Sequence, residues 1–371
     1  MKSFGIIAEF NPFHLGHKYL IDRAREVTGS DICVAVMSGS FVQRGGPAVF
    51  DKWERTRLAI EGGVNLLVEL PAVYATASAE HFAFGGVKTL EAMGCIDRLV
   101  FGSESGDVKL LEDAAHLLKK KDAEIFQLTR SFSKKGLAFP KAREEALHII
   151  SPNFDLGILR EPNNILAIEY IKQLESMEPY TIKRIGQGHH ESATALRNRI
   201  AAGNPEAFRQ AEANYFNLIR SRILQGSADE LEKMCAAGDG LGNRLKDSVR
   251  FAENTDDLIR KVKSKAYTYS SVERMLAHIV LGIEMNYSQA PAYIRVLGFD
   301  EKGAKLLKHI KKQEYNRVPV ITNINKEWEK LGDGQAMLEK DILATDVFNV
   351  IWNRNMYKES DYVKKPVIVT F

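Results

Sequence analysis

The feature that most restricts the fold is a regular alternation of short apolar runs and helical patterns in the first 100 residues. The apolar runs are Phe4–Ala8, Asp31–Met37, Val64–Leu70 and Ile96–Phe101. Between them, apolar residues recur at helical spacing in Gly16–Thr28, Lys52–Glu61 and Ala77–Met93. Strands that are apolar throughout are typical of parallel sheets covered on both faces. The alternation therefore predicts an α/β fold with a Rossmann-like parallel sheet, whose ligands bind beyond the carboxyl ends of its strands.

The remainder of the chain is predicted to be mainly helical. Residues 107–152 have the pattern of a charged helical insertion. After them we expect a helix over Pro162–Leu174, a strand over Thr181–Gly186 and a helix over Ser192–Ala201. Beyond Gly203 the pattern is almost continuously helical until the apolar end Pro366–Phe371. Since 371 residues exceed one ordinary core, we expect an α/β domain over residues 1–205 and a mostly α-helical C-terminal region over 206–371.

Composition and charge argue against several classes of protein. No apolar run approaches the roughly 20 residues that span a bilayer, and Glu9 interrupts the first run. We therefore expect a cytoplasmic protein without a membrane partner. Cys33, Cys95 and Cys235 lie far apart without a C-x-x-C pair, which argues against a disulfide framework or a thiolate zinc site. The net charge of +3 permits a nucleic-acid partner without requiring one.

The segment Asn11–His17 carries the strongest chemical signal, and we call it the H-x-G-H turn. It follows the first predicted strand and precedes a helix, whose N-terminus favours phosphate oxygens. Gly16 allows a nucleotide to approach the backbone closely. His14 and His17 lie about one helical turn apart and can donate hydrogen bonds to oxygens that gain charge when an α-phosphate is attacked. The alternative is a pair of histidines at a helix start without a role.

A second phosphate-binding pattern lies at the end of the predicted α/β domain. Ser192, Thr194 and Arg197 have S-x-T-x-x-R spacing and open a predicted helix. A serine or threonine cap orients the first turn of such a helix. Arg197 would reach back to the β- and γ-phosphates or to pyrophosphate. This six-residue pattern alone does not indicate phosphate binding specifically. Its occurrence together with the H-x-G-H turn in one α/β domain does.

These motifs resemble those of the nucleotidylyl transferase superfamily, which includes class I aminoacyl-tRNA synthetases. Longer stretches are similar to one family within it, the bacterial tRNA(Met) cytidine acetate ligases. They are Gly5–His17, Met37–Gly45, Glu69–Pro71 and Glu161–Leu166. The resemblance implies that ATP and acetate give acetyl-adenylate and pyrophosphate, and that the acetyl group then passes to N4 of the wobble cytidine of elongator tRNA(Met). It also implies that His14, His17 and Arg197 are catalytic.

The resemblance further implies a set of ATP-binding residues. They are Ile7, Ala8, Glu9, Phe10, Asn11, Pro12, Phe13, His14, Leu15, Gly16, His17, Lys18, Tyr19, Leu20, Gly102, Asn163, Asn164, Arg184, Ile185, Ser192 and Thr194. Gly102 ends a strand, where a sugar or base can lie against the backbone. The amide of Asn164 can bond ribose or base, or it can simply cap a helix. Arg184 can stack on the nucleotide, or it can be a surface charge.

The glycine-containing loop Ser38–Pro47 follows the second predicted strand and is expected to face the same site. Ser40, Gln43 and Arg44 would hold acetate, hold the adenylate or guide the cytidine. Lys52 and Arg55, one helical turn apart, would add positive charge. The alternative is a flexible loop with solvated charges.

Metal and RNA partners are predicted on weaker grounds. His189, His190 and Glu191 lack the spacing of a zinc site, so we predict no transition metal. Magnesium is expected with ATP because it screens the triphosphate. Basic clusters in the second half would grip tRNA or would form solvated helical faces. They are Arg244, Lys246 and Arg250; Arg260, Lys261, Lys263 and Lys265; and Lys305, Lys308, Lys311 and Lys312. Nearby Tyr267, Tyr269 and Tyr315 would stack on loop bases or pack within the protein.

Two other functions stay open from the residues alone. One is a small-molecule adenylyltransferase that releases pyrophosphate, and the other is a nucleotide-binding regulator without catalysis. Two intact motifs argue against the regulator. The large helical region favours an RNA substrate over a small acceptor. The sequence indicates no oligomeric state.

Overall fold

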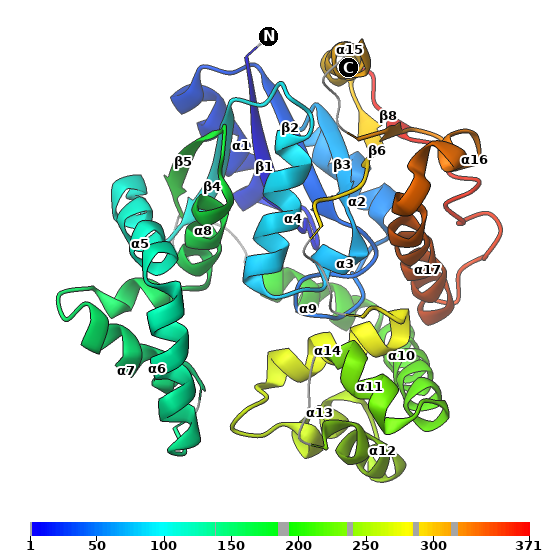
Figure 1. The fold of residues 1–371 in the computed structure, drawn as a ribbon. Coiled ribbons are helices and arrows are strands. Elements are labelled where there is room, and N and C mark those ends of the chain that lie inside the picture. The colour runs from blue at the N-terminus through cyan, green and yellow to red at the C-terminus, as the bar shows by residue number, and fades with distance from the viewer. Residues whose placement is uncertain (1, 138, 185–192, 236–239, 285–288, 313–317) are drawn as a thin grey trace.

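A computed structural model describes residues 2–137, 139–184, 193–235, 240–284, 289–312 and 318–371 of the chain. Its centre is an eight-stranded sheet (Figure 1). The strands are β1 Ser3–Ala8, β2 Ile32–Ser38, β3 Leu66–Leu70, β4 Arg98–Ser103, β5 Glu178–Lys183, β6 Ile294–Phe299, β7 Val320–Ile321 and β8 Val367–Ile368. Their order across the sheet is β5-β4-β1-β2-β3-β6-β7, and β8 pairs with β6.

The strands β1 to β5 form a parallel sheet, as the apolar runs predict. The strand order reverses at β1, which lies between β2 and β4. In open α/β sheets this reversal creates a crevice beyond the carboxyl ends of the strands. The H-x-G-H turn follows the carboxyl end of β1, so the fold places it at the crevice.

Helices surround the sheet and extend beyond it (Figure 1). They are α1 Leu15–Thr28, α2 Lys52–Glu61, α3 Ala72–Ala75, α4 Ala79–Glu91, α5 Val108–Lys120, α6 Asp122–Lys134, α7 Phe139–Ile150, α8 Pro162–Gln173, α9 Ala193–Gly203, α10 Pro205–Gln225, α11 Ala228–Cys235, α12 Leu241–Phe251, α13 Thr255–Val262, α14 Tyr269–Leu281, α15 Glu301–Lys312, α16 Ile324–Glu327 and α17 Gln335–Ile351. Two 3₁₀ helices span Leu156–Leu159 and Trp328–Gly334.

Alternate residues of the strands fill two separate cores, which is why these strands are apolar throughout. In β2, Val34 and Val36 pack on the α4 side with Leu90. Cys33 and Met37 point to the opposite core, which contains Ile21 of α1 as well as residues of α2. Both faces of the sheet are therefore covered.

The C-terminal half contributes more to the sheet than its sequence pattern predicts. The prediction of almost continuous helix beyond Gly203 is wrong at β6, which lies antiparallel to β3 and extends the sheet. β7 and β8 then pair in parallel with β6. Arg295 gives the β6 run a charged residue, which conceals a buried strand in the sequence. The predicted helix Ala77–Met93 is preceded by a separate short helix, α3.

The remaining helices form two groups beside the crevice. Helices α5 to α7 cover the predicted insertion 107–152 and project from the β5 side of the sheet (Figure 1). Helices α10 to α14 pack on one another below the carboxyl ends of the strands (Figure 1). α9 ends at Gly203 and α10 begins at Pro205, and the division into two domains near this point stays a prediction. No described helix is long and apolar enough to cross a membrane.

Candidate functional site

Mutual hydrogen bonds hold the two histidines of the H-x-G-H turn. His14 is the N-cap of α1, and its Nδ1 accepts a hydrogen bond from Gly16 N at 3.0 Å. His17 Nδ1 accepts one from His14 N at 3.2 Å, which completes a capping box. The rings stack with centroids 3.8 Å apart. Because both Nδ1 atoms accept backbone N–H groups, the proton of each neutral ring lies on Nε2, which leaves two Nε2–H donors.

The surroundings of His17 keep its imidazole neutral. Burial, the neighbouring His14 and the charge of Arg184 together lower the pKa of His17 well below its ordinary value. The rings of Phe10 and Phe13 flank it, at 5.0 and 5.5 Å between centroids. A neutral imidazole can donate from Nε2 at neutral pH without changing its charge.

Arg197 returns to the H-x-G-H turn across 186 residues of sequence. Its Nη1 donates to the carbonyl oxygen of Asn11 at 2.9 Å, and its Nη2 donates to Thr194 Oγ1 at 3.0 Å. The two phosphate-binding motifs are thus in direct contact through this side chain. Ser192 and Ile185 lie outside the described residues, as do His189, His190 and Glu191.

The predicted residues at the ends of β4 and β5 also come together. Asn164 Oδ1 accepts hydrogen bonds from the backbone N–H groups of Glu104 and Ser105, at 3.0 and 3.1 Å. The Asn163 side chain donates to Glu104 Oε1 at 2.5 Å and accepts from Arg184 Nη1 at 3.4 Å. Asn164 is therefore an internal support, whereas Asn163 and Arg184 form a pair at the crevice.

Two further residues shape this corner: Glu104, which is not predicted as functional from the sequence, and Gly102, which is predicted to lie against a sugar or base. Glu104 accepts a hydrogen bond from Asn164 N at 2.9 Å and so caps the start of α8. Its position directly after a strand end was the available signal in the sequence. A Cβ added at Gly102 would lie 3.3 Å from Arg184 Cγ, which is tighter than an ordinary contact. Glycine there leaves room for the arginine.

The loop Ser38–Pro47 is a closed turn that contacts Glu9, two residues before the H-x-G-H turn. Phe41 and Pro47 form an isolated antiparallel bridge. Gln43 N donates to Glu9 Oε1 at 2.9 Å. Burial raises the pKa of Glu9, while Arg197, Arg55 and Arg44 oppose that shift. Ser40 is 2% exposed, and its hydroxyl lies 3.2 Å from Thr345 Oγ1, so it is engaged inside the protein.

Lys52 and Arg55 are predicted to add positive charge to the site, and the structure distinguishes the two: Lys52 is paired elsewhere, whereas the buried charge of Arg55 still acts on Glu9. Arg55 is fully buried and donates to the carbonyl oxygens of Glu9 at 2.7 Å, Ser38 at 3.0 Å, Phe50 at 3.0 Å and also Gly39. It joins the carboxyl ends of β1 and β2 to the following loop. A sequence pattern cannot distinguish an exposed arginine from a buried one that donates to four backbone carbonyls.

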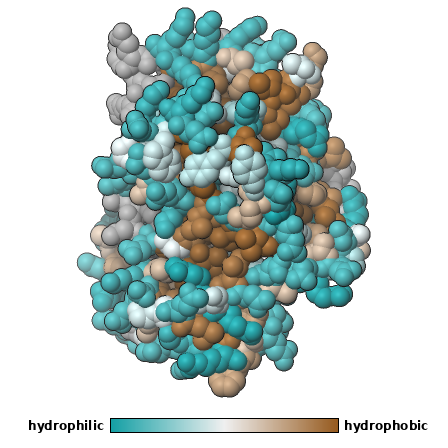
Figure 2. Space-filling view, turned by 90° about the vertical axis from the view of Figure 1, so that its right-hand side faces the viewer, coloured by the Kyte–Doolittle hydropathy of each residue, from teal (hydrophilic) through white to brown (hydrophobic). Residues whose placement is uncertain are grey.

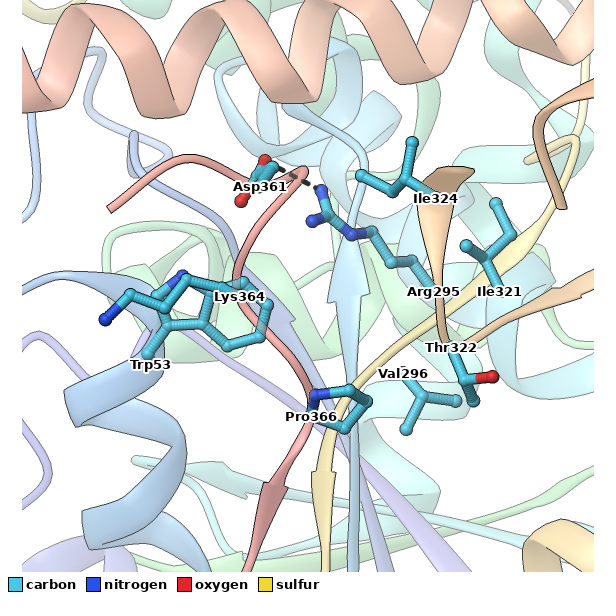
Figure 3. Close-up of a pocket in the computed structure, with 9 residues that line it drawn as sticks. All are labelled: Trp53, Arg295, Val296, Ile321, Thr322, Ile324, Asp361, Lys364 and Pro366. Atoms are coloured by element: carbon cyan, nitrogen blue, oxygen red, sulfur yellow. Dashed lines mark hydrogen bonds and ion pairs between the residues drawn. The ribbon is translucent and has the colours of Figure 1, made fainter. Parts of the chain in front are cut away.

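Lys52 belongs to a buried ion cluster at the β6 edge of the sheet. Its Nζ lies 2.8 Å from Glu69 Oε1 and 2.9 Å from Asp361 Oδ2. Arg295 Nη1 lies 2.9 Å from Glu69 Oε2. It also lies 3.0 Å from Asp361 Oδ2, the contact drawn as a dashed line in Figure 3. Thr345 Oγ1 also donates to that Asp361 oxygen, at 2.9 Å. The small pocket at the cluster is lined in part by Arg295 and Asp361 and by none of the predicted site residues that the structure describes.

Only some of the predicted RNA-binding residues have side chains that are exposed and could contact RNA. Several are used inside the helical region: Arg244 and Lys246 donate to backbone carbonyls, and Arg250, Arg260 and Lys261 pair with aspartates. Tyr269 donates to Asp256 Oδ1 at 2.9 Å. Tyr267 packs partly buried against the core, and Tyr315 lies outside the described residues. Lys263, Lys265 and the lysines of α15 have exposed side chains.

Another face of the molecule has a patch of exposed apolar side chains. Figure 2 shows them in the middle of the side formed by α17 and the C-terminal segment. Leu343 and Val350 are exposed apolar residues of α17. A shallow groove between α10 and α17 is lined by Asn214, Asn217, Leu218, Val350 and Asn353. Within the described part of the chain, no group of three or more His, Cys, Asp or Glu side chains is arranged to hold a metal ion.

Comparison with known proteins agrees with this geometry. The family model of the HIGH Nucleotidyl Transferases matches residues 1–362. The tRNA(Met) cytidine acetate ligase of Thermoanaerobacter pseudethanolicus is 37% identical to this chain, and the match covers 98% of each protein. That of Clostridium perfringens is 34% identical, over 99% of this chain and 100% of the relative.

A solved structure extends the similarity to three dimensions. The crystal structure of Thermotoga maritima TmcAL bound with alpha-thio ATP is 30% identical in sequence, with a TM-score of 0.89 over 100% of both chains. The fold, the joined motifs and these similarities have one explanation. The chain belongs to the tRNA(Met) cytidine acetate ligase family of HIGH nucleotidyl transferases.

Proposed function

We propose that this protein joins ATP and acetate to form acetyl-adenylate and pyrophosphate, and then transfers the acetyl group to N4 of the wobble cytidine of elongator tRNA(Met). One observation carries the proposal most directly. Arg197 of the second motif bonds the Asn11 carbonyl, which brings a cation to the helix start that presents the His14 and His17 donors. This arrangement suits a triphosphate whose α-phosphorus is attacked while pyrophosphate leaves.

In the first step an acetate oxygen attacks the α-phosphorus, and the bond to pyrophosphate breaks. The Nε2–H groups of His14 and His17 would bond oxygens of the reacting phosphates. Both histidines act by position and charge stabilisation, because their Nδ1 atoms are occupied by backbone N–H groups. Arg197 would stabilise the negative charge that grows on the leaving pyrophosphate.

In the second step the N4 amine of cytidine attacks the acetyl carbonyl carbon, and the bond to AMP breaks. The mixed anhydride is already activated, so the protein mainly has to bring the amine and the carbonyl together. Gln43 and Arg44, on the loop that contacts Glu9, are the residues we assign to guiding acetate or cytidine. Ser40 would act only through the position of the loop, because Thr345 engages its hydroxyl.

The remaining parts of the nucleotide would lie along the crevice. We assign the ribose and base to the corner of Gly102, Asn163 and Arg184, where two polar side chains meet a glycine. Magnesium would arrive as Mg·ATP, with phosphates and water supplying its ligands. Negative charge on acetate and RNA is compatible with Arg44, Arg184 and Arg197 at the same crevice.

The experiment that tests this function is product analysis. The protein is incubated with ATP, labelled acetate and tRNA(Met), and the RNA is digested to nucleosides. We expect labelled N4-acetylcytidine and one AMP released per acetyl group. Transfer without ATP, or no labelled RNA with all three substrates present, would contradict the proposal. AMP joined to an acceptor other than acetate would indicate a small-molecule adenylyltransferase.

A further inference from the structure

The Ser38–Pro47 loop lies between the nucleotide site and the helical region, and both sides hold it. On the nucleotide side, Gln43 N bonds Glu9 Oε1, and Val49 N, just after the loop, bonds Asn11 Oδ1 at 2.9 Å. Both acceptors belong to the β1–α1 connection that leads into His14. The loop and the residue just after it therefore donate to side chains of the connection that leads to the catalytic histidines.

On the opposite side, the loop rests on α10 and α14 at Gly45. The hydroxyl of Tyr215, from α10, donates to Gly45 O at 3.2 Å in a buried position. Gly45 has φ +96°, and a Cβ added there would lie 2.6 Å from both Glu273 O and Arg274 Cα of α14. Only glycine fits, because a side chain would meet helix backbone that cannot rotate away.

The loop is stiff enough to transmit a displacement. Val42 N bonds Gly46 O at 3.1 Å, Gly45 N bonds Val42 O at 2.8 Å, and Ala48 N bonds Ser40 O at 3.0 Å. Gln43 and Arg44 are therefore carried on a hydrogen-bonded turn. A movement of Gly45 would move Gln43 and with it the contact to Glu9.

We propose that Tyr215 and Gly45 are positioning residues, through which the helical region holds the Gln43–Arg44 turn in its working place at the nucleotide site. This inference rests on the function proposed above. It adds that the reaction requires the loop to be held in place. Helices α10 and α14 contribute to the reaction by bracing the loop, in addition to any contact with RNA.

Two adjacent glycines provide a matched test. Gly45→Ala places a methyl group against the backbone of α14, whereas a Cβ at Gly46 would have Glu273 Oε1 as its nearest neighbour, at an ordinary 3.9 Å. We expect Gly45→Ala to lower kcat of acetate-dependent ATP–pyrophosphate exchange by at least about ten-fold. Gly46→Ala should stay within about two-fold of the unmodified protein, and equal kcat for the two variants would overturn the inference.

Tyr215→Phe removes one hydroxyl and keeps the ring, which lies 6.1 Å from Phe41 between centroids. We expect kcat to fall about five-fold, which corresponds to the net free energy of about 1 kcal/mol that one hydrogen bond typically contributes. In an Arg44→Ala background the same change should have little further effect, since both act through one turn. Additive losses in this double-mutant cycle would indicate a merely structural role and would contradict the proposal.

Hydrogen–deuterium exchange gives a readout independent of catalysis. We expect Tyr215→Phe and Gly45→Ala to raise amide exchange in residues 38–50, including the Gln43 amide that bonds Glu9. Unchanged protection in both variants would overturn the bracing role even if the protein proved to have a different acceptor. The opposite result is also informative. If amide exchange in residues 38–50 changes but the protein activates no acid, the bracing role stands and only the proposed function is contradicted.

Discussion

At the scale of single residues, the backbone hydrogen bonds of a short motif determine the orientation of its two histidines. The helix start places both rings on one side, and backbone N–H groups occupy both Nδ1 atoms. These bonds fix the orientation of both rings and place the proton of each neutral ring on Nε2. Gly16 is required by this stacking, because a Cβ there would lie 2.8 Å from His14 Cε1.

Replacement of either histidine tests this assignment. We expect His14→Ala or His17→Ala to lower the rate of ATP–pyrophosphate exchange by about 10²-fold, as one lost transition-state donor does elsewhere. His116, exposed on α5, is the control, and His116→Ala should exchange at the normal rate. Undiminished exchange in a His14 or His17 variant would remove that residue from the reaction.

The sequence predicts the site well where chemistry depends on neighbours along the chain. The H-x-G-H turn is local, so its position between a strand and a helix follows from the sequence, whereas the capping of α1 by the histidines is not predicted. Lys52 and Arg55 illustrate the limit of such reasoning, since their partners are Glu69, Asp361 and carbonyls of distant loops. Only the tertiary fold determines whether such charges face solvent or the interior.

At the scale of elements, β6 depends on the buried ion cluster. Arg295 makes β6 resemble an exposed segment in the sequence, yet Glu69 of β3 and Asp361 of the C-terminal segment neutralise it within the sheet edge. The cluster thus joins β3, β6, α2 and the C-terminal segment. Removing one partner leaves a buried charge without full compensation.

We predict that Asp361→Ala lowers the free energy of unfolding by about 3–5 kcal/mol, the usual effect of breaking a buried ion pair. Urea denaturation followed by circular dichroism measures this change. The exposed pair of Arg57 and Glu61 provides the comparison, and Glu61→Ala should cost about 0.5 kcal/mol or less. Similar losses in the two variants would show that the cluster does not stabilise the sheet edge.

His278 makes the contact between α14 and the α/β domain sensitive to acid. Its Nε2 lies 3.1 Å from Thr76 O, and burial lowers the pKa of His278 to about 4. A histidine whose pKa is lower in the folded state stabilises the fold above pH 6.5, and that contribution is lost as pH falls toward 4.

From these values we predict a loss of about 2 kcal/mol in unfolding free energy between pH 7 and pH 5 that is due to His278. His278→Gln should lose less stability than the unmodified protein over the same interval, because glutamine does not titrate. Chemical denaturation at the two pH values measures both proteins. Parallel losses would assign the acid sensitivity to other groups.

At the scale of the whole molecule, the two sets of exposed lysines lie at different ends of the sheet. β6 is antiparallel to β3, and its last residue, Phe299, pairs with Leu66 at the start of β3. α15 therefore begins at the edge opposite to the H-x-G-H turn, and Figure 1 shows it far from α9 to α14. Lys263 and Lys265 instead precede α14, whose residues touch the Ser38–Pro47 loop.

This placement predicts a difference in tRNA binding. Lys263→Glu with Lys265→Glu should weaken tRNA(Met) binding more than charge reversal of Lys308, Lys311 and Lys312, although both sets should leave acid activation intact. The slope of the logarithm of the binding constant against the logarithm of the salt concentration should become less steep by about one for each phosphate contact that is lost. Filter binding at several salt concentrations measures this, and a larger effect from the α15 lysines would assign the RNA path to the opposite end of the sheet.

The central claim is that the crevice beyond β1 activates a carboxylic acid with ATP, and one measurement tests it most directly. Purified protein is assayed for acetate-dependent ATP–pyrophosphate exchange with and without bulk tRNA. We predict exchange that requires acetate and proceeds without RNA. No exchange with acetate, either alone or with tRNA, would contradict the claim.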